Sequence, residues 1–195
     1  MNLNIEKILD SNILIYSILE DHPASDVSEK LLLSCENKFT WTTSPITFLE
    51  TFHVLIKIYG QDKSKTLHKI KEAMKSPLDI KPLNMQLIFS SLEKSIKHLI
   101  DTNDAILLQI AIDFGIPIIA TDDKKLINAC ESYGIICENP INDNIRKHMS
   151  EWELKNLPKK GITRIYSNVY NWLQQIDKKI ANKFKSETNS FTTTL

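Results

Sequence analysis

The chain has 195 residues, of which 42% are hydrophobic and 25% are charged, as in one globular domain with or without an appendage. No apolar run approaches the roughly 20 residues that a membrane-spanning helix needs, and the first residues do not resemble a secretory signal. The three cysteines form no CxxC pair, which favours a reducing compartment over a disulfide framework. We therefore expect a cytoplasmic protein with no membrane partner.

The formal net charge is zero, but the charge is unevenly distributed along the chain. Residues 1–141 carry a net charge of −5, and residues 142–195 carry +5 and both arginines. Such asymmetry indicates a contact with nucleic acid or with a partner, or simply the basic exposed face of a helix.

Residues 5–137 alternate short apolar segments with amphipathic ones. In chain order we expect a strand at 5–9, helices at 11–19 and 21–35, a strand at 39–43, helices at 45–58 and 61–75, a strand at 78–81, helices at 82–99 and 102–114, a strand at 117–120, a helix at 122–133 and a strand at 135–137. The strands are apolar throughout, which is typical of a parallel sheet covered by helices on both faces. The fold class is therefore α/β.

Local signals mark several helix boundaries. Ser44 and Pro45 are a typical cap and first residue of a helix, and Gly115 is a typical stop. Thr102 or Asn103 is expected to cap the helix that Gly115 ends. The expected inner face of the helix that begins at Pro45 consists of Ile46, Leu49, Val54 and Ile58.

The pattern changes beyond Pro140. Apolar residues then recur at intervals of three or four, which predicts an amphipathic helix of about six turns; these residues are Ile162, Ile165, Val169, Trp172, Ile176, Ile180 and Phe184. We therefore divide the chain into a domain at 1–141, a basic amphipathic helical extension at 142–186 that docks on another surface, and a tail at 187–195 that is expected to be disordered.

Acidic residues recur at the ends of the expected strands. Asp10 follows the first strand, Glu50 lies in the second turn of the helix after 39–43, Asp104 lies in the first turn of its helix, and Asp123 follows the strand at 117–120. Ligands in open α/β sheets gather at this carboxyl edge, near the point where the strand order reverses. Each acid alone also fits a helix start, and Asp10 or Ser11 is a good cap.

Several carboxylates in one cleft repel each other strongly unless a cation is bound. Oxygen-only sites of this kind suit hard divalent metals, with Mg²⁺ or Mn²⁺ as the natural candidates. A metal held in this way can activate a water and stabilise charge on a phosphodiester that is being cut.

Four segments, in this order and spacing, resemble the PIN-domain ribonucleases, and most closely the VapC-type toxins and their prokaryotic relatives. The segments are ILDSNILIY, SPITFLETFHVLIKIYG, NDAILLQIA and PIIATDDKKL. The resemblance covers about residues 5–140 and leaves the C-terminal extension unexplained. It implies a PIN-like parallel sheet with an acidic metal cleft.

The resemblance also implies roles for individual residues. The catalytic and metal-binding set would be Asp10, Glu50, Asp104 and Asp123. The auxiliary set would be Asn12, which accompanies the first acid, Asp101 as a helper of Asp104, Thr121 of the T-x-D-x-x-[FL] signature, and Asp122 at its variable position.

The resemblance implies an endoribonuclease that cleaves RNA and depends on Mg²⁺ or Mn²⁺. Members of the family are frequently homodimers. If the chain is the toxin of a toxin–antitoxin pair, an antitoxin protein is a further partner. Two alternatives remain open. One is an RNA processing or decay nuclease without an antitoxin, and the other is a non-catalytic PIN-like module that binds RNA or acts as a scaffold.

Basic residues suggest where RNA would lie. The candidates are Lys124, Lys125, Lys159, Lys160 and Arg164. The last three lie among aromatic residues that could stack on bases, although these aromatics equally suit docking of the extension. The five histidines are scattered and are interpreted as ordinary surface or helix residues.

Overall fold

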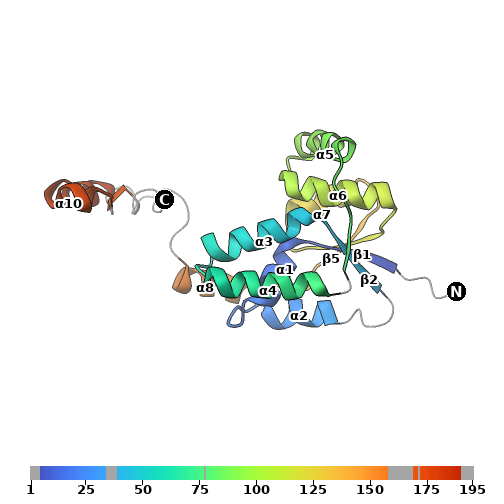
Figure 1. Cartoon of the computed structure of the whole chain (residues 1–195), viewed down its shortest axis with the longest axis horizontal. Helices are drawn as coiled ribbons and strands as arrows, with labels where there is room; N and C mark the ends of the chain where they lie inside the picture. The colour runs from blue at the N-terminus through green and yellow to red at the C-terminus, as the bar shows by residue number, and fades with distance from the viewer. Residues whose placement is uncertain (1–4, 34–38, 77, 158–168, 171, 190–195) are drawn as a thin grey trace. The chain divides into compact units, whose positions relative to one another are not determined.

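The computed structural model describes residues 5–33, 39–76, 78–157, 169–170 and 172–189 (Figure 1). The chain forms two compact units, Met1–Ser150 and Glu151–Leu195. In the part of the chain that the structure describes, every helix is too short or too polar to span a membrane.

The first unit is built on a five-stranded parallel sheet in the order β3-β2-β1-β4-β5. The strands are β1 (Ile5–Leu9), β2 (Phe39–Thr43), β3 (Leu78–Ile80), β4 (Ile118–Ala120) and β5 (Ile136–Glu138). The first three strands proceed in one direction across the sheet, and the last two proceed in the other. The order therefore reverses between β1 and β4, and the expected parallel α/β fold is confirmed.

Helices connect the strands and cover the sheet (Figure 1). They are α1 (Ser11–Ile18), α2 (Ser25–Leu33), α3 (Pro45–Lys57), α4 (Lys63–Lys75), α5 (Met85–His98), α6 (Thr102–Phe114) and α7 (Lys124–Glu131). Helix α8 (Asp143–Asn156) follows the last strand. Helix α2 begins later than expected, because residues 21–24 form a turn in which the Ser25 N–H donates to the His22 carbonyl at 2.9 Å. Helix α8 lies within the helical extension expected at 142–186, although the apolar periodicity noted in the sequence begins only at residue 162.

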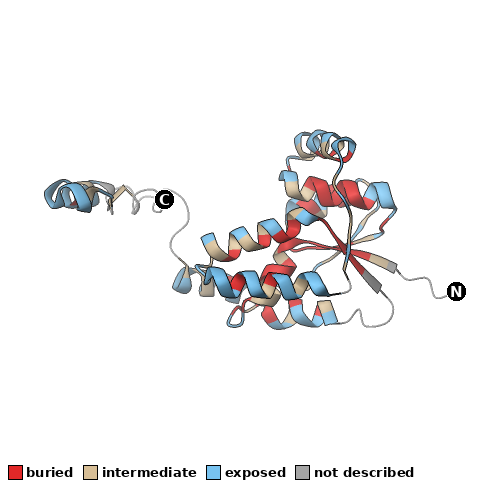
Figure 2. Ribbon diagram, viewed as in Figure 1, coloured by how far each residue is buried: buried red, intermediate tan, exposed pale blue. Residues whose placement is uncertain are grey.

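The core has two layers, one on each face of the sheet (Figure 2). Neighbouring residues of a strand point to opposite faces. Accordingly, Ile8 and Ile119 pack with buried residues of α5, α6 and α7, whereas Leu9 and Ala120 pack with those of α1 to α4. Buried hydrophobic side chains thus fix β1 and β4 from both sides.

The expected inner face of α3 is confirmed at Ile46 and Val54, which are partly buried against the core, but it is wrong at Leu49. Leu49 is 65% exposed, whereas Thr47, Phe48, Thr51 and Leu55 are buried. The threonines tolerate burial because their hydroxyls are satisfied locally: Thr51 donates to the Thr47 carbonyl at 2.7 Å, and the Thr47 hydroxyl accepts a bond from a β2 threonine.

A buried histidine differs from its sequence interpretation as an ordinary surface or helix residue. His22 is 4% exposed and stacks on Tyr16 with ring centroids 4.9 Å apart, while Tyr59 meets it edge-on. Burial lowers the pKa of His22 to about 4, so the ring is neutral at physiological pH.

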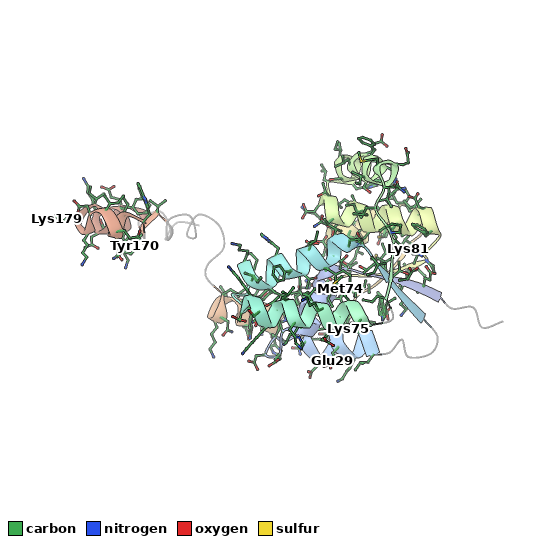
Figure 3. All side chains as sticks on the ribbon, in the orientation of Figure 1. Glu29, Met74, Lys75, Lys81, Tyr170 and Lys179 are labelled. Carbon is green, nitrogen blue, oxygen red and sulfur yellow. The ribbon has the colours of Figure 1, made fainter. Side chains whose placement is uncertain are left out.

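Two lysines form ion pairs that join strands of the sheet. Lys81, directly after β3, forms ion pairs with Asp79 at 2.6 Å and with Glu6 at 3.5 Å (Figure 3). On the central strand, the buried Lys7 pairs with Glu138 of β5 at 2.6 Å. These pairs link β1 to both edges of the sheet.

The second unit contains α10 (Lys178–Asn189). The Asp177 carboxylate accepts bonds from the Lys179 and Ile180 N–H groups at 2.7 and 3.2 Å, so a helix starts here and the expected continuous helix is wrong at this point. Lys185 Nζ lies 5.4 Å from the ring centroid of Tyr170, a residue labelled in Figure 3. Of the residues expected on the apolar face, those at 162 and 165 lie outside the described residues, as do residues 190–195 of the expected tail.

Candidate active site

Two loops meet where the strand order reverses. Asp10 follows β1 directly, and Thr121 to Asp123 follow β4 directly. The Asp10 N–H donates to the Ala120 carbonyl at 3.2 Å, so the two strand ends stay paired to the edge of the sheet. This is the edge and the position where open α/β sheets place their ligands.

Asp10 lies buried at the centre of a hydrogen-bond network. Its side chain is 2% exposed, and its Oδ2 accepts bonds from the Thr121 hydroxyl at 2.6 Å and from Asn12 Nδ2 at 2.7 Å. Its Oδ1 accepts a bond from the Ser11 N–H, so Asp10 also caps α1. Asp10 is therefore both the cap of α1 and a residue of the candidate site, and Thr121 and Asn12 fix the direction of its carboxylate.

The carboxylates expected at the site influence one another electrostatically. Burial is the main cause that raises the pKa of Asp104 to about 8, and the negative charges of Asp10, Asp123, Glu50 and Asp101 add to it. Burial also raises the pKa of Asp10 to about 6, where Glu50 adds to the effect and the hydrogen bond from Thr121 opposes it. The fold thus brings all four acids of the expected set into one electrostatic neighbourhood.

The same acids do not form a closed ligand cage. Among the described residues, no group of three or more His, Cys, Asp or Glu side chains is arranged to hold a metal ion. Asp123 caps α7, since its Oδ1 accepts bonds from the Lys125 and Leu126 N–H groups at 2.7 and 3.0 Å. The four carboxylates are therefore close enough to affect one another electrostatically, and the donor atoms that they offer are all oxygens.

Asp122 makes contacts that its neighbour Asp123 does not. Its side chain is buried, and its Oδ1 accepts bonds from Asn139 Nδ2 at 3.2 Å and from Arg146 Nη2. Its Oδ2 accepts a bond from Arg146 Nη1 at 3.4 Å. Sequence reasoning missed Asn139 and Arg146, although the concentration of both arginines after residue 141 was a visible signal.

The remaining expected residues are placed as follows. Asp101 is exposed and is the residue that caps α6, although its side chain makes no cap bond, so the expected cap at Thr102 or Asn103 is wrong. Lys124 and Lys125 are exposed on the first turn of α7. The other basic candidates, Lys159, Lys160 and Arg164, lie outside the described residues.

The family model of the PIN domain matches residues 7–131, which is more than half of the chain. The chain belongs to the PIN-domain family. The resemblance seen in the sequence is thereby confirmed, and the match runs from β1 to the end of α7 and so stops before β5 and α8. No curated protein matches the chain.

Solved structures share the PIN fold. VapC20 of Mycobacterium tuberculosis, a sarcin–ricin loop cleaving toxin, has 13% identity and a TM-score of 0.57 over 67% of this chain and 96% of the toxin. VapBC2 of Rickettsia felis, bound to a fragment of promoter DNA, has 21% identity and a TM-score of 0.53 over 69% and 98%. VapBC-1 of nontypeable Haemophilus influenzae has 15% identity and a TM-score of 0.51 over 70% and 98%.

Proposed function

We propose that this PIN-domain protein is a metal-dependent endoribonuclease in which Asp10, Glu50, Asp104 and Asp123 are the catalytic and metal-binding residues. The observation that carries the proposal is that Asp104 is buried close to the negative charges of Asp10, Asp123 and Glu50: burial, and after it these charges, raise the pKa of Asp104 to about 8. A site that holds so many acids together gains most from a bound cation, because the cation offsets their repulsion.

The donor set fits Mg²⁺ or Mn²⁺. Hard divalent ions prefer carboxylate oxygens, and the four residues of the proposed set offer these. A bound ion would supply activation of a water and stabilisation of negative charge on a phosphodiester. Asp10, Glu50, Asp104 and Asp123 would hold this ion.

The residues that contact Asp10 would orient its carboxylate. Thr121 and Asn12 donate to Oδ2 of Asp10, which keeps the carboxylate fixed while its other contacts change. The hydrogen bond from Thr121 also lowers the pKa of Asp10 relative to what burial alone would give, and so favours the charged form that binds a cation.

RNA is the substrate class that we propose, with cleavage in the cytoplasm. The fold that this chain shares with a sarcin–ricin loop cleaving toxin and with VapBC complexes supports an RNA target and an antitoxin partner. A second copy of the chain as partner is proposed only from the resemblance to PIN-domain ribonucleases. The exposed Lys124 and Lys125 follow Asp123 and would contact phosphates beside the cut. A processing nuclease without an antitoxin would use the same site.

A non-catalytic RNA-binding module is the second candidate. The observation that favours it is the lack, among the described residues, of a ready group of three metal-holding side chains. Cleavage itself separates the two candidates.

The test is cleavage of labelled single-stranded RNA by the purified full chain with Mn²⁺, with Mg²⁺ and with a chelator. Asp10→Asn is the site variant, because asparagine keeps the size and the helix cap while it removes the charge. Asp26→Asn, an exposed acid on α2, is the matched control. We expect metal-dependent cleavage by the wild type and the control, and at least a hundredfold loss in Asp10→Asn. Equal rates for all three proteins would refute the assignment, and binding of RNA without any cleavage would favour the non-catalytic module.

A further inference from the structure

Helix α8 is tied to the loop that carries the expected acids. Arg146, in the first turn of α8, donates through both Nη atoms to the carboxylate of Asp122. Asp122 is flanked by Thr121 and Asp123, and the ion pair spans 24 residues of the chain. Both residues lie in the first unit, and the pair joins Asp122, inside the matched PIN domain, to Arg146, beyond the end of that match.

We propose that Arg146 is a positioning residue that, through Asp122, holds the loop Thr121–Asp123 in the geometry that the active site requires. The proposal rests on the proposed nuclease function for its consequences in catalysis. Its structural part, that Arg146 orders this loop, stands independently of that function.

A continuous set of hydrogen bonds leads from Asp122 to the centre of the site. The Asp122 N–H points to Asn12 Oδ1 at 3.4 Å, and Asn12 in turn donates to Asp10 at 2.7 Å. The Thr121 hydroxyl donates to Asp10 and accepts a bond from the Asp123 N–H at 3.0 Å. A shift of the loop therefore moves two of the donors that orient Asp10.

The charge of Arg146 is needed because Asp122 is a buried carboxylate. The Asp122 side chain is 7% exposed, and Arg146 and the neutral amide of Asn139 donate hydrogen bonds to it. Removing one partner of a buried ion pair leaves an uncompensated charge, which is strongly destabilising at that place. Without Arg146 we expect the loop to turn Asp122 outward to water, away from its present position.

Helix α8 has an anchor of its own. Met149 is 6% exposed and packs in an apolar cluster with Ala24 and Ile141. Asn139, which donates to Asp122, also accepts a bond from the Ile141 N–H at 2.8 Å. The apolar anchor and the ion pair can therefore be removed separately, which makes the proposal testable.

The experiment compares Arg146→Ala, Arg146→Lys, Asp122→Asn and the double variant with wild type, in the full chain. Lys147→Ala is the matched control, because it removes one exposed positive charge from the same helix. Met149→Ala weakens the docking of α8 without touching the ion pair. Three quantities are measured: amide hydrogen exchange over residues 120–126 in the absence of metal, the dissociation constant for Mn²⁺, and kcat and KM for RNA.

We expect Arg146→Ala to speed exchange over residues 120–126, to weaken Mn²⁺ binding about tenfold and to lower kcat about tenfold with little change in KM. Lys147→Ala stays at the wild-type values. Arg146→Lys recovers part of the loss, since lysine restores the charge but not the two-atom contact. The double variant is no worse than the worse single variant, because both remove one interaction.

Two results would overturn the proposal. One is exchange and Mn²⁺ binding in Arg146→Ala equal to those of wild type. The other is the same local increase in exchange in Met149→Ala, which would assign the effect to docking of α8 alone. If wild type neither binds Mn²⁺ nor cleaves RNA, the proposed function fails, and the exchange of residues 120–126 still decides whether Arg146 orders the loop.

Discussion

The Thr121 hydroxyl donates a 2.6 Å hydrogen bond to Oδ2 of Asp10, across the two neighbouring strands between which the order of the sheet reverses. Both residues are buried, so neither has water as a substitute partner. This bond joins the two loops on which the proposed site is built.

Replacing Thr121 by valine removes the donor and keeps the shape. We expect a loss of about 1 to 3 kcal/mol in the free energy of unfolding near pH 7, because a buried carboxylate loses a partner. The pKa of Asp10 should rise further above about 6, since the bond from Thr121 lowers it. Denaturant unfolding measures the stability, and Thr121→Ser is the control that keeps the hydroxyl. A valine variant as stable as the serine variant would contradict this account.

The pH dependence of stability without metal reports on Asp104. Its pKa is raised in the folded protein from 3.8 to about 8, so the folded state binds a proton that the unfolded state has lost. The stabilisation by that proton is complete below about pH 4 and disappears as the pH rises toward 8. We expect the free energy of unfolding of the wild type to fall by up to a few kcal/mol over this window. The free energy of unfolding of Asp104→Asn should fall clearly less.

The difference between the two profiles reports on the carboxyl group of Asp104 together with its coupling to Asp10, whose pKa is raised to about 6. His22 acts in the opposite direction, because its lowered pKa of about 4 makes protonation destabilising as the pH falls from about 6.5. His22 is present in both proteins, so its contribution cancels in the difference. Parallel profiles for wild type and Asp104→Asn over pH 4–8 would show that Asp104 is not perturbed.

Metal binding should reverse the loss of stability at high pH. Carboxylates bind Mn²⁺ only when deprotonated, and the raised pKa values of Asp10 and Asp104 keep protons on the site below neutrality. At a fixed Mn²⁺ concentration we therefore expect a larger rise in Tm at pH 8 than at pH 6. Asp26→Asn should behave like wild type in this thermal scan, and a rise in Tm that does not depend on pH would speak against binding by these acids.

Much of the fold and the candidate site could be predicted from the sequence, because local pattern determines them. Asp10 and Asp123 follow apolar strands, and parallel strands end at a common edge, so their approach follows from topology. The inner face of α3 was predicted only in part, because the burial of Thr47 and Thr51 depends on hydroxyl bonds that hydrophobicity does not register.

Tertiary contacts account for the features that the sequence did not reveal. Only Met149 of α8 is buried, so this helix carries almost no apolar period. The pairing of Arg146 with Asp122 depends on how α8 docks, and residue spacing along the chain does not specify that arrangement.

The central claim is that Asp10, Glu50, Asp104 and Asp123 together bind a divalent metal ion, Mg²⁺ or Mn²⁺. The most direct test is to titrate Mn²⁺ into the wild type, into the four single variants to Asn or Gln and into the Asp26→Asn control. Electron paramagnetic resonance measures the free and bound Mn²⁺ at each step. We expect saturable binding by wild type and the control, and an affinity weakened about tenfold or more in each of the four variants. Wild-type affinity in any two of the four, or no saturable binding by wild type, would contradict the account.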